Sequence, residues 1–410
     1  MVYKHLRASV MAFIVLCQVS AVFAYSGGSG TADDPYQIGT VADWNDLMNT
    51  PSDWDANFVM SADINLQGIP LTPVGNDMVG IDFTGVFDGN GHIIRNATIN
   101  MPGYWHIGLF GIIDANSIIR NLGVEDVNMS GERDIAGLAG CSQGTIRNCY
   151  ATGKIGYAPM MPNGANLGGL VGLNYGTITG SHAFCDVNGN TNWVGGLVGR
   201  NLGTIIDSYA AGTVNGNEKV GGLVGENNFI YDEFTHEFTY VGTIARCYAA
   251  GSVTGGSGLV GTNGSDLMAR TAGLSITDCY SICEVTGGAG LAGKNYGYIT
   301  NCYAAGKVNG NGGGLIGGTP GAPPPALNSF WDIEATGQAT SGSGTGLTTA
   351  EMRTLSTFTS AGWDFVETWG IGENQTYPFL RTYCGADLNY DGLVDFNDFA
   401  VWAGHWLEGI

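Results

Sequence analysis

One pattern recurs in register between residues 137 and 320, and it constrains the fold more than any other feature of the sequence. The unit reads Gly-Thr-Ile-x-x-Cys/Ser-Tyr-Ala-x-Gly-x-Val-x-Gly and continues Gly-Gly-Leu-Val-Gly-x-Asn. Its copies, spaced by 32, 27, 39, 31 and 24 residues, start at Gly144, Gly176, Gly203, Gly242, Gly273 and Gly297. A core of about 24 residues that accepts insertions at fixed points indicates stacked structural repeats.

Each copy contains three short apolar runs separated by Gly or Asn turns, which predicts three strands rather than a helix. In one copy these runs are marked by Ile205, by Tyr209 with Val214, and by Leu223. One unit cannot bury its own apolar face, so consecutive units must stack at the ~4.8 Å spacing of paired strands. Connections between parallel strands prefer the right hand. We therefore predict an all-β chain that winds as a right-handed parallel β-solenoid (β-helix), with glycines at corners where a Cβ would meet the neighbouring coil.

The composition agrees with a sheet built on tight turns. The 410 residues include 68 Gly and 12 Pro, which excludes a long helical array, and 44% hydrophobic residues, which excludes a disordered chain. Charged residues make up 12%, against ~25% in ordinary soluble domains. The excess of 36 Asp and Glu over 15 Lys and Arg gives a net charge of −21. Nucleic acid is not an expected partner, because binding it needs clustered cations.

Stacking turns equivalent positions into columns. One column holds Cys149, Ser181, Ser208, Cys247, Cys279 and Cys302, and the next holds Tyr150, His182, Tyr209, Tyr248, Tyr280 and Tyr303. Small side chains repeated in register predict an inward-facing ladder. Two states of the thiols stay open: buried and free, or bridged, with Cys279 and Cys302 on neighbouring coils within disulfide reach. Cys185 and Cys283 replace a repeated Gly, and no Cys-x-x-Cys pair indicates a metal site.

The repeat resembles the GLUG family, which is named after a Gly-Leu-hydrophobic-Gly signature. Clear instances are Gly169-Leu170-Val171-Gly172 and Gly222-Leu223-Val224-Gly225, and the block from Phe83 to His92 is similar to the usual lead-in to such arrays. The resemblance covers about residues 80–320. It implies a secreted or surface protein of bacteria and assigns no catalytic activity to the repeat.

The segments outside the repeat divide the chain further. Residues 1–24 have the basic start, apolar run and small-residue ending of a secretory signal peptide, and no later run is long enough for a membrane span. Residues 25–80 are expected to cap the solenoid of residues 81–320, with strands at 36–38 and 58–60 and a helix that Thr40 begins. Residues 321–383 form the second cap, where a capping box at Thr348 and Glu351 predicts a helix to about Thr359.

Residues 384–410 carry the most specific chemical motif. The run 387–398 places oxygen ligands at the spacing of an EF-hand Ca²⁺ loop, with Gly392 at the sharp turn. The expected Ca²⁺ ligands are Asp387, Asn389, Asp391, the Leu393 carbonyl, Asp395 and Asp398. Asp398 stands where an EF-hand has Glu, and an amphipathic helix over 396–407 follows. In both respects the motif resembles a type I dockerin repeat.

The resemblance to a dockerin implies attachment, with a cohesin-like protein as a possible partner. A complete dockerin has two such loops and this chain has one. Sorting or attachment, pairing with another chain, and a vestigial role therefore stay open.

The search for an active site yields no acid/base constellation, Ser/His/Asp signature or phosphate loop. Single carboxylates in the repeats are interpreted as isolated solvent-facing charges, namely Asp186, Asp207, Glu218, Asp278 and Glu284. The insert Glu226–Tyr240 is either a ligand-binding flap or an amphipathic loop lying on the solenoid.

The sequence thus predicts a secreted, non-catalytic, adhesin-like protein that binds or scaffolds at a surface or in a matrix. Its expected partners are an extracellular glycan or a cell-surface protein, and its Ca²⁺-binding tail serves attachment. The alternative is a carbohydrate-active enzyme, a polysaccharide lyase or glycoside hydrolase, or its accessory subunit.

Overall fold

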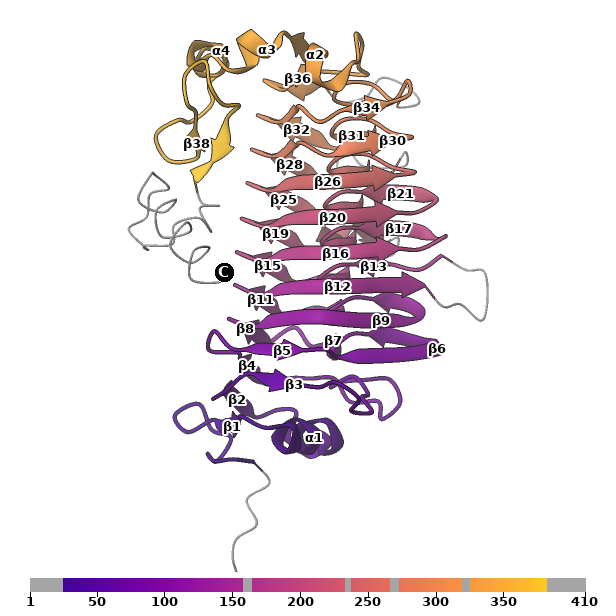
Figure 1. Cartoon of the computed structure of the whole chain (residues 1–410), viewed down its shortest axis with the longest axis vertical. Coiled ribbons are helices and arrows are strands. Elements are labelled where there is room, and N and C mark those ends of the chain that lie inside the picture. Colours follow the sequence, from indigo (N-terminus) through magenta and orange to yellow (C-terminus); the bar gives the residue numbers. More distant parts are fainter. Residues whose placement is uncertain (1–24, 158–163, 233–236, 266–272, 319–324, 382–410) are drawn as a thin grey trace, which may run out of the picture.

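The chain winds as a long stack of parallel β-coils, which confirms the predicted all-β parallel solenoid (Figure 1). The computed structural model describes residues 25–157, 164–232, 237–265, 273–318 and 325–381. Each coil contributes strands in a fixed order to three faces, here named sheets 1, 2 and 3. The predicted signal peptide and the predicted Ca²⁺ loop both lie outside the described residues.

Sheet 1 has eleven strands that all pair in parallel along the solenoid axis. In order along the axis they are β1 (Tyr36–Ile38), β2 (Asn57–Met60), β4 (Val86–Asp88), β8 (Ile118–Arg120), β11 (Thr145–Arg147), β15 (Thr177–Thr179), β19 (Thr204–Ile206), β25 (Thr243–Ala245), β28 (Ser275–Thr277), β32 (Tyr298–Thr300) and β35 (Ala326–Leu327). The same sheet thus continues through β1 and β2, which lie in the segment expected to cap the solenoid.

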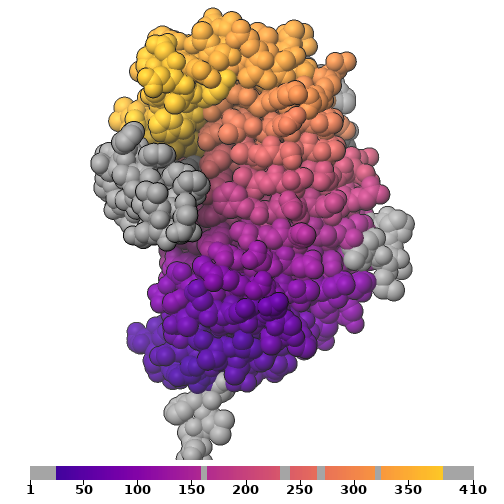
Figure 2. All heavy atoms as spheres, in the orientation of Figure 1, coloured from indigo at the N-terminus to yellow at the C-terminus, as the bar shows by residue number. Residues whose placement is uncertain are grey.

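Sheet 2 is the broad face towards the viewer in Figure 1, and Figure 2 shows its surface as an unbroken succession of coils. Its strands are β3 (Ile64–Asn65), β5 (Ile93–Arg95), β6 (Thr98–Ile107), β9 (Gly123–Ile135), β12 (Tyr150–Tyr157), β16 (His182–Asn188), β20 (Tyr209–Asn215), β26 (Tyr248–Thr254), β29 (Tyr280–Ser281), β30 (Glu284–Thr286), β33 (Tyr303–Ala304), β34 (Val308–Asn309), β36 (Phe330–Asp332) and β37 (Thr345–Leu347). At its edge lie β13 (Leu167–Gly168), β17 (Asn192–Gly195) and β21 (Glu218–Gly221).

Sheet 3 closes each coil before the chain returns to sheet 1. Its strands are β7 (Phe110–Ile113), β10 (Ala139–Ser142), β14 (Val171–Asn174), β18 (Val198–Asn201), β22 (Val224–Asn227), β27 (Val260–Asn263) and β31 (Ala292–Asn295). Between β22 and β25, the insert forms an antiparallel hairpin of β23 (Phe229–Asp232) and β24 (Glu237–Val241).

Fully buried ladders of identical side chains fill the interior. One is the isoleucine column of sheet 1, Ile119, Ile146, Ile178, Ile205, Ile244, Ile276 and Ile299. Another is the signature leucine column, Leu138, Leu170, Leu197, Leu223, Leu259, Leu291 and Leu315. The register shows that the fifth repeat copy begins at Leu274 and not at Gly273, since Ser275 pairs with Thr243.

The glycine before each signature leucine confirms the predicted steric reason for it. A Cβ placed on Gly196 or Gly222 would overlap the backbone carbonyl oxygen of the glycine one coil further along. Any side chain here would push two coils apart, so the stack itself selects glycine.

An asparagine ladder lines one buried corner of the solenoid, where sheet 3 returns to sheet 1. The amide nitrogen of each side chain donates to the amide oxygen of the next, each bond 2.8 Å long, through Asn174, Asn201, Asn227, Asn263 and Asn295. All five residues are buried. Because Asn201, Asn227 and Asn263 each donate along the axis and accept from the coil before, the ladder supplies partners that burial would otherwise deny.

The N-terminal end carries the predicted helix. α1 (Val41–Asn49) begins with a capping box in which Thr40 and Asp43 bond each other, as the sequence predicts. Trp44 of this helix packs edge-on against Phe87 and Phe110 inside the first coils. The 3₁₀ turn η1 (Pro51–Asp53) follows.

The C-terminal end differs from prediction in one respect. The capping box at Thr348 and Glu351 forms, but the expected single helix is two, α3 (Thr349–Met352) and α4 (Leu355–Ser360). The reason is Glu373, whose carboxylate accepts the Leu355 N–H at 2.7 Å and so starts a second helix. α2 (Ile333–Thr336) and the hairpin of β38 (Trp369–Gly370) and β39 (Phe379–Leu380) complete this end.

The asparagine ladder yields a stability prediction. Asn227→Ala removes a donor and an acceptor from the middle of the buried ladder, and each group left unsatisfied costs ~1–3 kcal/mol. We expect the guanidinium midpoint, followed by circular dichroism, to fall clearly. The control is Asn188→Ala at the exposed end of β16, which should leave the midpoint unchanged. Equal midpoints for the two variants would contradict the role given to the ladder.

Candidate functional site

Two columns of residues face each other along a groove between the edge of sheet 2 and sheet 3. The first, here called the turn column, consists of the residue that comes directly before the buried residue of each strand at the edge of sheet 2. The strand register places in it His106, Asp134, Asn166, Trp193 and Lys219. In the next coil the turn is three residues shorter, because Asn215 pairs with Thr254 and Gly221 with Ser257, so Gly255 lies over Gly216 and nothing stands opposite Lys219. His106, Asp134, Trp193, Lys219, Gly255 and Gly287 have positive φ angles, so the backbone turns sharply at these positions.

The second column, here called the outward column, is the row of sheet 3 residues that points away from the interior. In order along the axis it consists of Cys141, Leu173, Arg200, Glu226, Thr262 and Lys294. The chemical character of this column changes from apolar to charged and polar as the solenoid proceeds.

In the middle coils, side chains of the two columns meet and fill the groove. Glu226 is only 2% exposed, and each of its carboxylate oxygens faces a cation: Lys219 Nζ at 2.6 Å and Arg200 Nε at 2.9 Å. Both cations also lie over the Trp193 ring, 5.1 and 5.9 Å from its centre. A buried carboxylate is tolerated here because two cations offset its desolvation.

Earlier in the column, His106 lies between two carboxylates. Its Nδ1 is 2.7 Å from Asp77 and its Nε2 is 3.2 Å from the buried Asp134. Burial alone would lower the pKa of His106, but the bonds to Asp134 and Asp77 outweigh burial and raise the pKa above its ordinary value. The imidazolium thus neutralises part of an otherwise acidic end of the groove.

In the later coils the groove is open. The turn is shorter here and passes through Gly255 and Gly287, so no side chain equivalent to that of Lys219 bridges the gap, and a cavity of about 400 Å³ results. Its polar lining comes from Glu218, Lys219, Thr262, Lys294 and Asn311, above a floor of glycine backbone. This open segment is the candidate binding site of the molecule.

The predicted aromatic column is confirmed on the outer side of sheet 2. Rings of neighbouring coils stack at centroid distances of 4.7–5.1 Å, with interplanar angles of 3–5°, from Tyr150 through His182 to Tyr303. Burial lowers the pKa of His182 to about 4, so this ring is neutral like its tyrosine neighbours. Because the rings cover each other's faces, the column fastens coil to coil.

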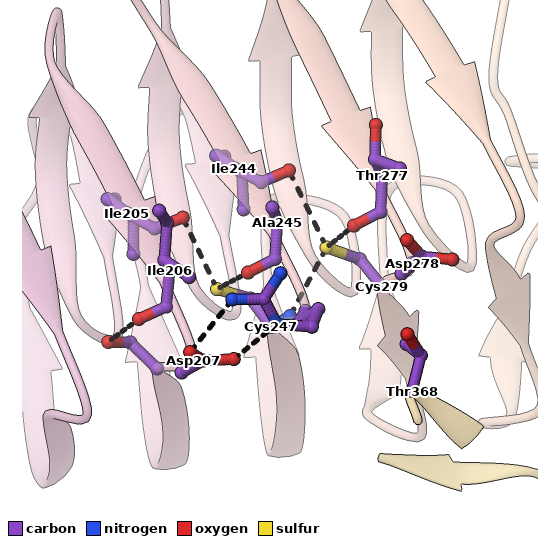
Figure 3. A network of polar contacts seen from close by, with 12 residues as sticks. Ile205, Ile206, Asp207, Ile244, Ala245, Cys247, Thr277, Asp278, Cys279 and Thr368 are labelled. Atoms are coloured by element: carbon purple, nitrogen blue, oxygen red, sulfur yellow. Dashed lines mark hydrogen bonds and ion pairs between the residues drawn. The ribbon is translucent and has the colours of Figure 1, made fainter. Parts of the chain in front are cut away.

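The predicted Cys/Ser column is confirmed as an inward ladder, and its thiols are free. Figure 3 shows the sulfurs of Cys247 and Cys279 between backbone carbonyls. Cys247 donates to Ala245 O at 3.1 Å, and its own N–H donates to the Cys279 sulfur at 3.3 Å. Ser181 and Ser208 repeat the pattern with hydroxyls. The position therefore selects a small side chain that both donates and accepts.

The structure changes the interpretation of two carboxylates in the repeats. Asp207 binds Arg246 through both oxygens at 2.6 and 2.9 Å, and Asp278 accepts the Trp369 indole N–H at 3.2 Å. The prediction of isolated, solvent-facing charges is wrong for these two. Asp186, Glu218 and Glu284 are exposed as predicted.

Sequence reasoning missed the groove. Glu226, assigned to the insert, in fact ends up on β22, facing two cations. The available signal was the length of the turn before the signature glycines, which spans six positions from Asn215 to Gly221 but three from Thr254 to Ser257. The six predicted Ca²⁺ ligands, Asp387 to Asp398, lie outside the described residues.

The fold and the repeating corners define a class, a parallel β-solenoid with signature glycines at its corners. The family model described as the GLUG motif matches residues 131–156 and 191–215. The chain is therefore a β-solenoid protein that carries GLUG motifs.

Two curated proteins are similar to the chain. A putative Gly-rich membrane protein of Evansella cellulosilytica is 36% identical over 90% of this chain and 48% of its own length. Halomucin of Haloquadratum walsbyi is 31% identical over 37% of this chain and 2% of its own length. The chain thus spans about half of the first relative and a small part of the second.

A solved structure with a similar course is a putative immunoglobulin A1 protease from Bacteroides ovatus. It has a TM-score of 0.47 and 19% identity, over 88% of this chain and 96% of the other. Across the described part of our chain, the helices are too short or too polar to cross a membrane.

The thiol ladder predicts chemical inertness. Burial raises the pKa of Cys149 and of Cys283 to about 12, and raises the pKa values of Cys279 and Cys302 well above the ordinary value. Since the thiolate is the reactive form, we expect none of the seven described cysteines to react with Ellman's reagent in the folded protein at neutral pH. Cys384→Ser removes the remaining thiol of residues 25–410, and full reaction in guanidinium is the control. Rapid labelling without denaturant would overturn the assignment.

Proposed function

We propose that this protein is a secreted, non-catalytic β-solenoid that binds and scaffolds at a cell surface or in an extracellular matrix. The observation that carries the proposal is the open groove on a rigid stack of coils. Its lining is fixed by repeated backbone geometry. Such a groove presents a surface of constant shape to a ligand.

The relatives support an exterior location. One bears the name of a Gly-rich membrane protein and the other is a halomucin, and the likeness to the first extends over 90% of this chain. A predicted signal peptide at residues 1–24 agrees with export. The net charge of −21 favours a soluble surface that repels its own copies.

The tail is proposed to attach the solenoid through Ca²⁺. Its ligands would be Asp387, Asn389, Asp391, the Leu393 carbonyl, Asp395 and Asp398, all hard oxygen donors of the kind that Ca²⁺ prefers. A cohesin-like protein or another chain would then hold the loop and its following helix. The solenoid remains free to present its groove.

A polysaccharide panel tests binding against catalysis. We expect acidic or neutral polysaccharides to retard the protein in affinity electrophoresis, with no release of reducing ends or unsaturated products. Product release would establish the alternative, a carbohydrate-active enzyme. Glu226→Gln then tests whether this carboxylate takes part. An enzyme that uses Glu226 would lose turnover in this variant, whereas a protein that only binds polysaccharide would still be retarded by it. If no polysaccharide retards the protein and none yields a product, glycan binding is contradicted.

Calorimetry tests the tail. We expect one Ca²⁺ to bind with a dissociation constant below ~1 mM, since EF-hand loops span that range. Asp387→Ala should abolish the signal, because it removes the first ligand of the loop. The matched control is Asp186→Ala, an exposed carboxylate on β16, which should leave the isotherm unchanged. The same isotherm for wild type and Asp387→Ala refutes the Ca²⁺ loop.

A further inference from the structure

We infer that the open groove from Lys219 to Asn311 binds a short stretch of an acidic polysaccharide, two to three sugar residues long, with a carboxylate facing Lys294. The inference rests on the proposed binding function and names the ligand class of the same site. It follows from the dimensions of the groove, its polar lining and its charge.

The dimensions select one extended chain. The groove crosses four coils, from Lys219 through Gly255 and Gly287 to Asn311, so it is about 14 Å long at ~4.8 Å per coil. A volume of about 400 Å³ over that length leaves a cross-section of about 30 Å². This admits a single polymer chain and excludes a folded domain. A pyranose ring is about as long as one coil rise, so successive sugars would meet equivalent backbone.

The floor cannot be filled by the protein itself. A Cβ on Gly256, Gly288 or Gly312 would overlap backbone atoms of the preceding coil. Together with the short turns at Gly255 and Gly287, this keeps the groove open in each of these coils. The opening is thus enforced by the stacking and by the length of these turns.

Two polar side chains of the outward column point to a ligand. Thr262 is only 5% exposed and lines the groove. Lys294, one coil further, is exposed and has no ion pair within the described ranges. A buried hydroxyl and a single ammonium one coil apart match the hydroxyls and carboxylate of an acidic sugar.

The groove is less acidic than the molecule as a whole. Its charged lining consists of Glu218, Lys219 and Lys294, and Lys219 is paired with Glu226, whereas the whole chain carries 36 acidic and 15 basic residues. Lys294 is therefore the cation of the described lining that can attract an anionic ligand to this place.

A peptide fits the groove less well. Peptides bind sheets by pairing with a free strand edge. The floor amides are already used between coils: Ser257 N–H bonds Val220 O at 2.8 Å, and Gly258 N–H bonds Ala289 O at 3.0 Å. The apolar lining is limited to Val220 and Ala289, which leaves no pocket for a large side chain.

The test compares matched ligands by calorimetry on the full chain: tetragalacturonate, cellotetraose and tetraglutamate. We expect tetragalacturonate to bind best and Lys294→Gln to weaken it by about tenfold or more, the effect of one lost charge-assisted bond. The control is Lys154→Gln, which removes an equally exposed lysine on β12, outside the groove, and should change affinity less than about twofold. Thr262→Arg introduces the residue that the outward column has two coils earlier, Arg200. Its long side chain should fill the groove and block binding.

The outcomes separate the inference from the function on which it rests. Equal affinity for cellotetraose overturns the acidic class but leaves glycan binding intact. Equal affinity for tetraglutamate shows recognition of charge alone and overturns the saccharide. If tetragalacturonate binds and neither Lys294→Gln nor Thr262→Arg weakens its binding, while the melting temperatures are unchanged, the site lies elsewhere and the assignment is overturned. Retention of large polysaccharides without binding of any tetrasaccharide rejects this groove while the general binding function stands.

Discussion

The parallel hydrogen bonding of each coil to the next is the constraint on which the rest of this structure depends. It fixes the register in all three sheets, so the environment of every side chain is set by its equivalent one coil away. Isoleucine stacks on isoleucine, amide on amide and ring on ring. Each column therefore favours a residue whose side chain can pack against, or hydrogen-bond to, an identical side chain. Asparagine suits this requirement because one amide group both donates and accepts.

Cysteine and serine share a column for the same reason. Each donates to a backbone carbonyl two residues earlier and accepts the N–H of the coil before it, as Cys247, Cys279 and Ser208 illustrate. The sulfur is thus a hydrogen-bonding group of the scaffold. This explains why seven buried cysteines coexist without a bridge in the described part of the chain.

Most of the fold was predictable from the sequence because alignment of the repeats with one another gives the register in which the coils pair. The Ile, Leu, Cys/Ser and Tyr columns all followed from alignment, and both capping boxes followed from a local Thr-x-x-Asp/Glu motif. The groove was not predictable in this way. It arises where two columns lie opposite each other across a corner, and nothing in the linear spacing of Lys219 and Glu226 shows that the two side chains meet. Likewise, Asp207 has its partner Arg246 one coil away, 39 positions along the chain.

The turn column has a consequence for how such a molecule changes over generations. Whether a coil is blocked or open depends on the length of one turn, because residues 217–219, which include Lys219, have no counterpart in the next coil. Duplication of an open coil would lengthen the groove by one coil and leave the hydrophobic interior unchanged. The length of the groove can therefore change with the number of coils, without the destabilised intermediates that remodelling a globular pocket imposes.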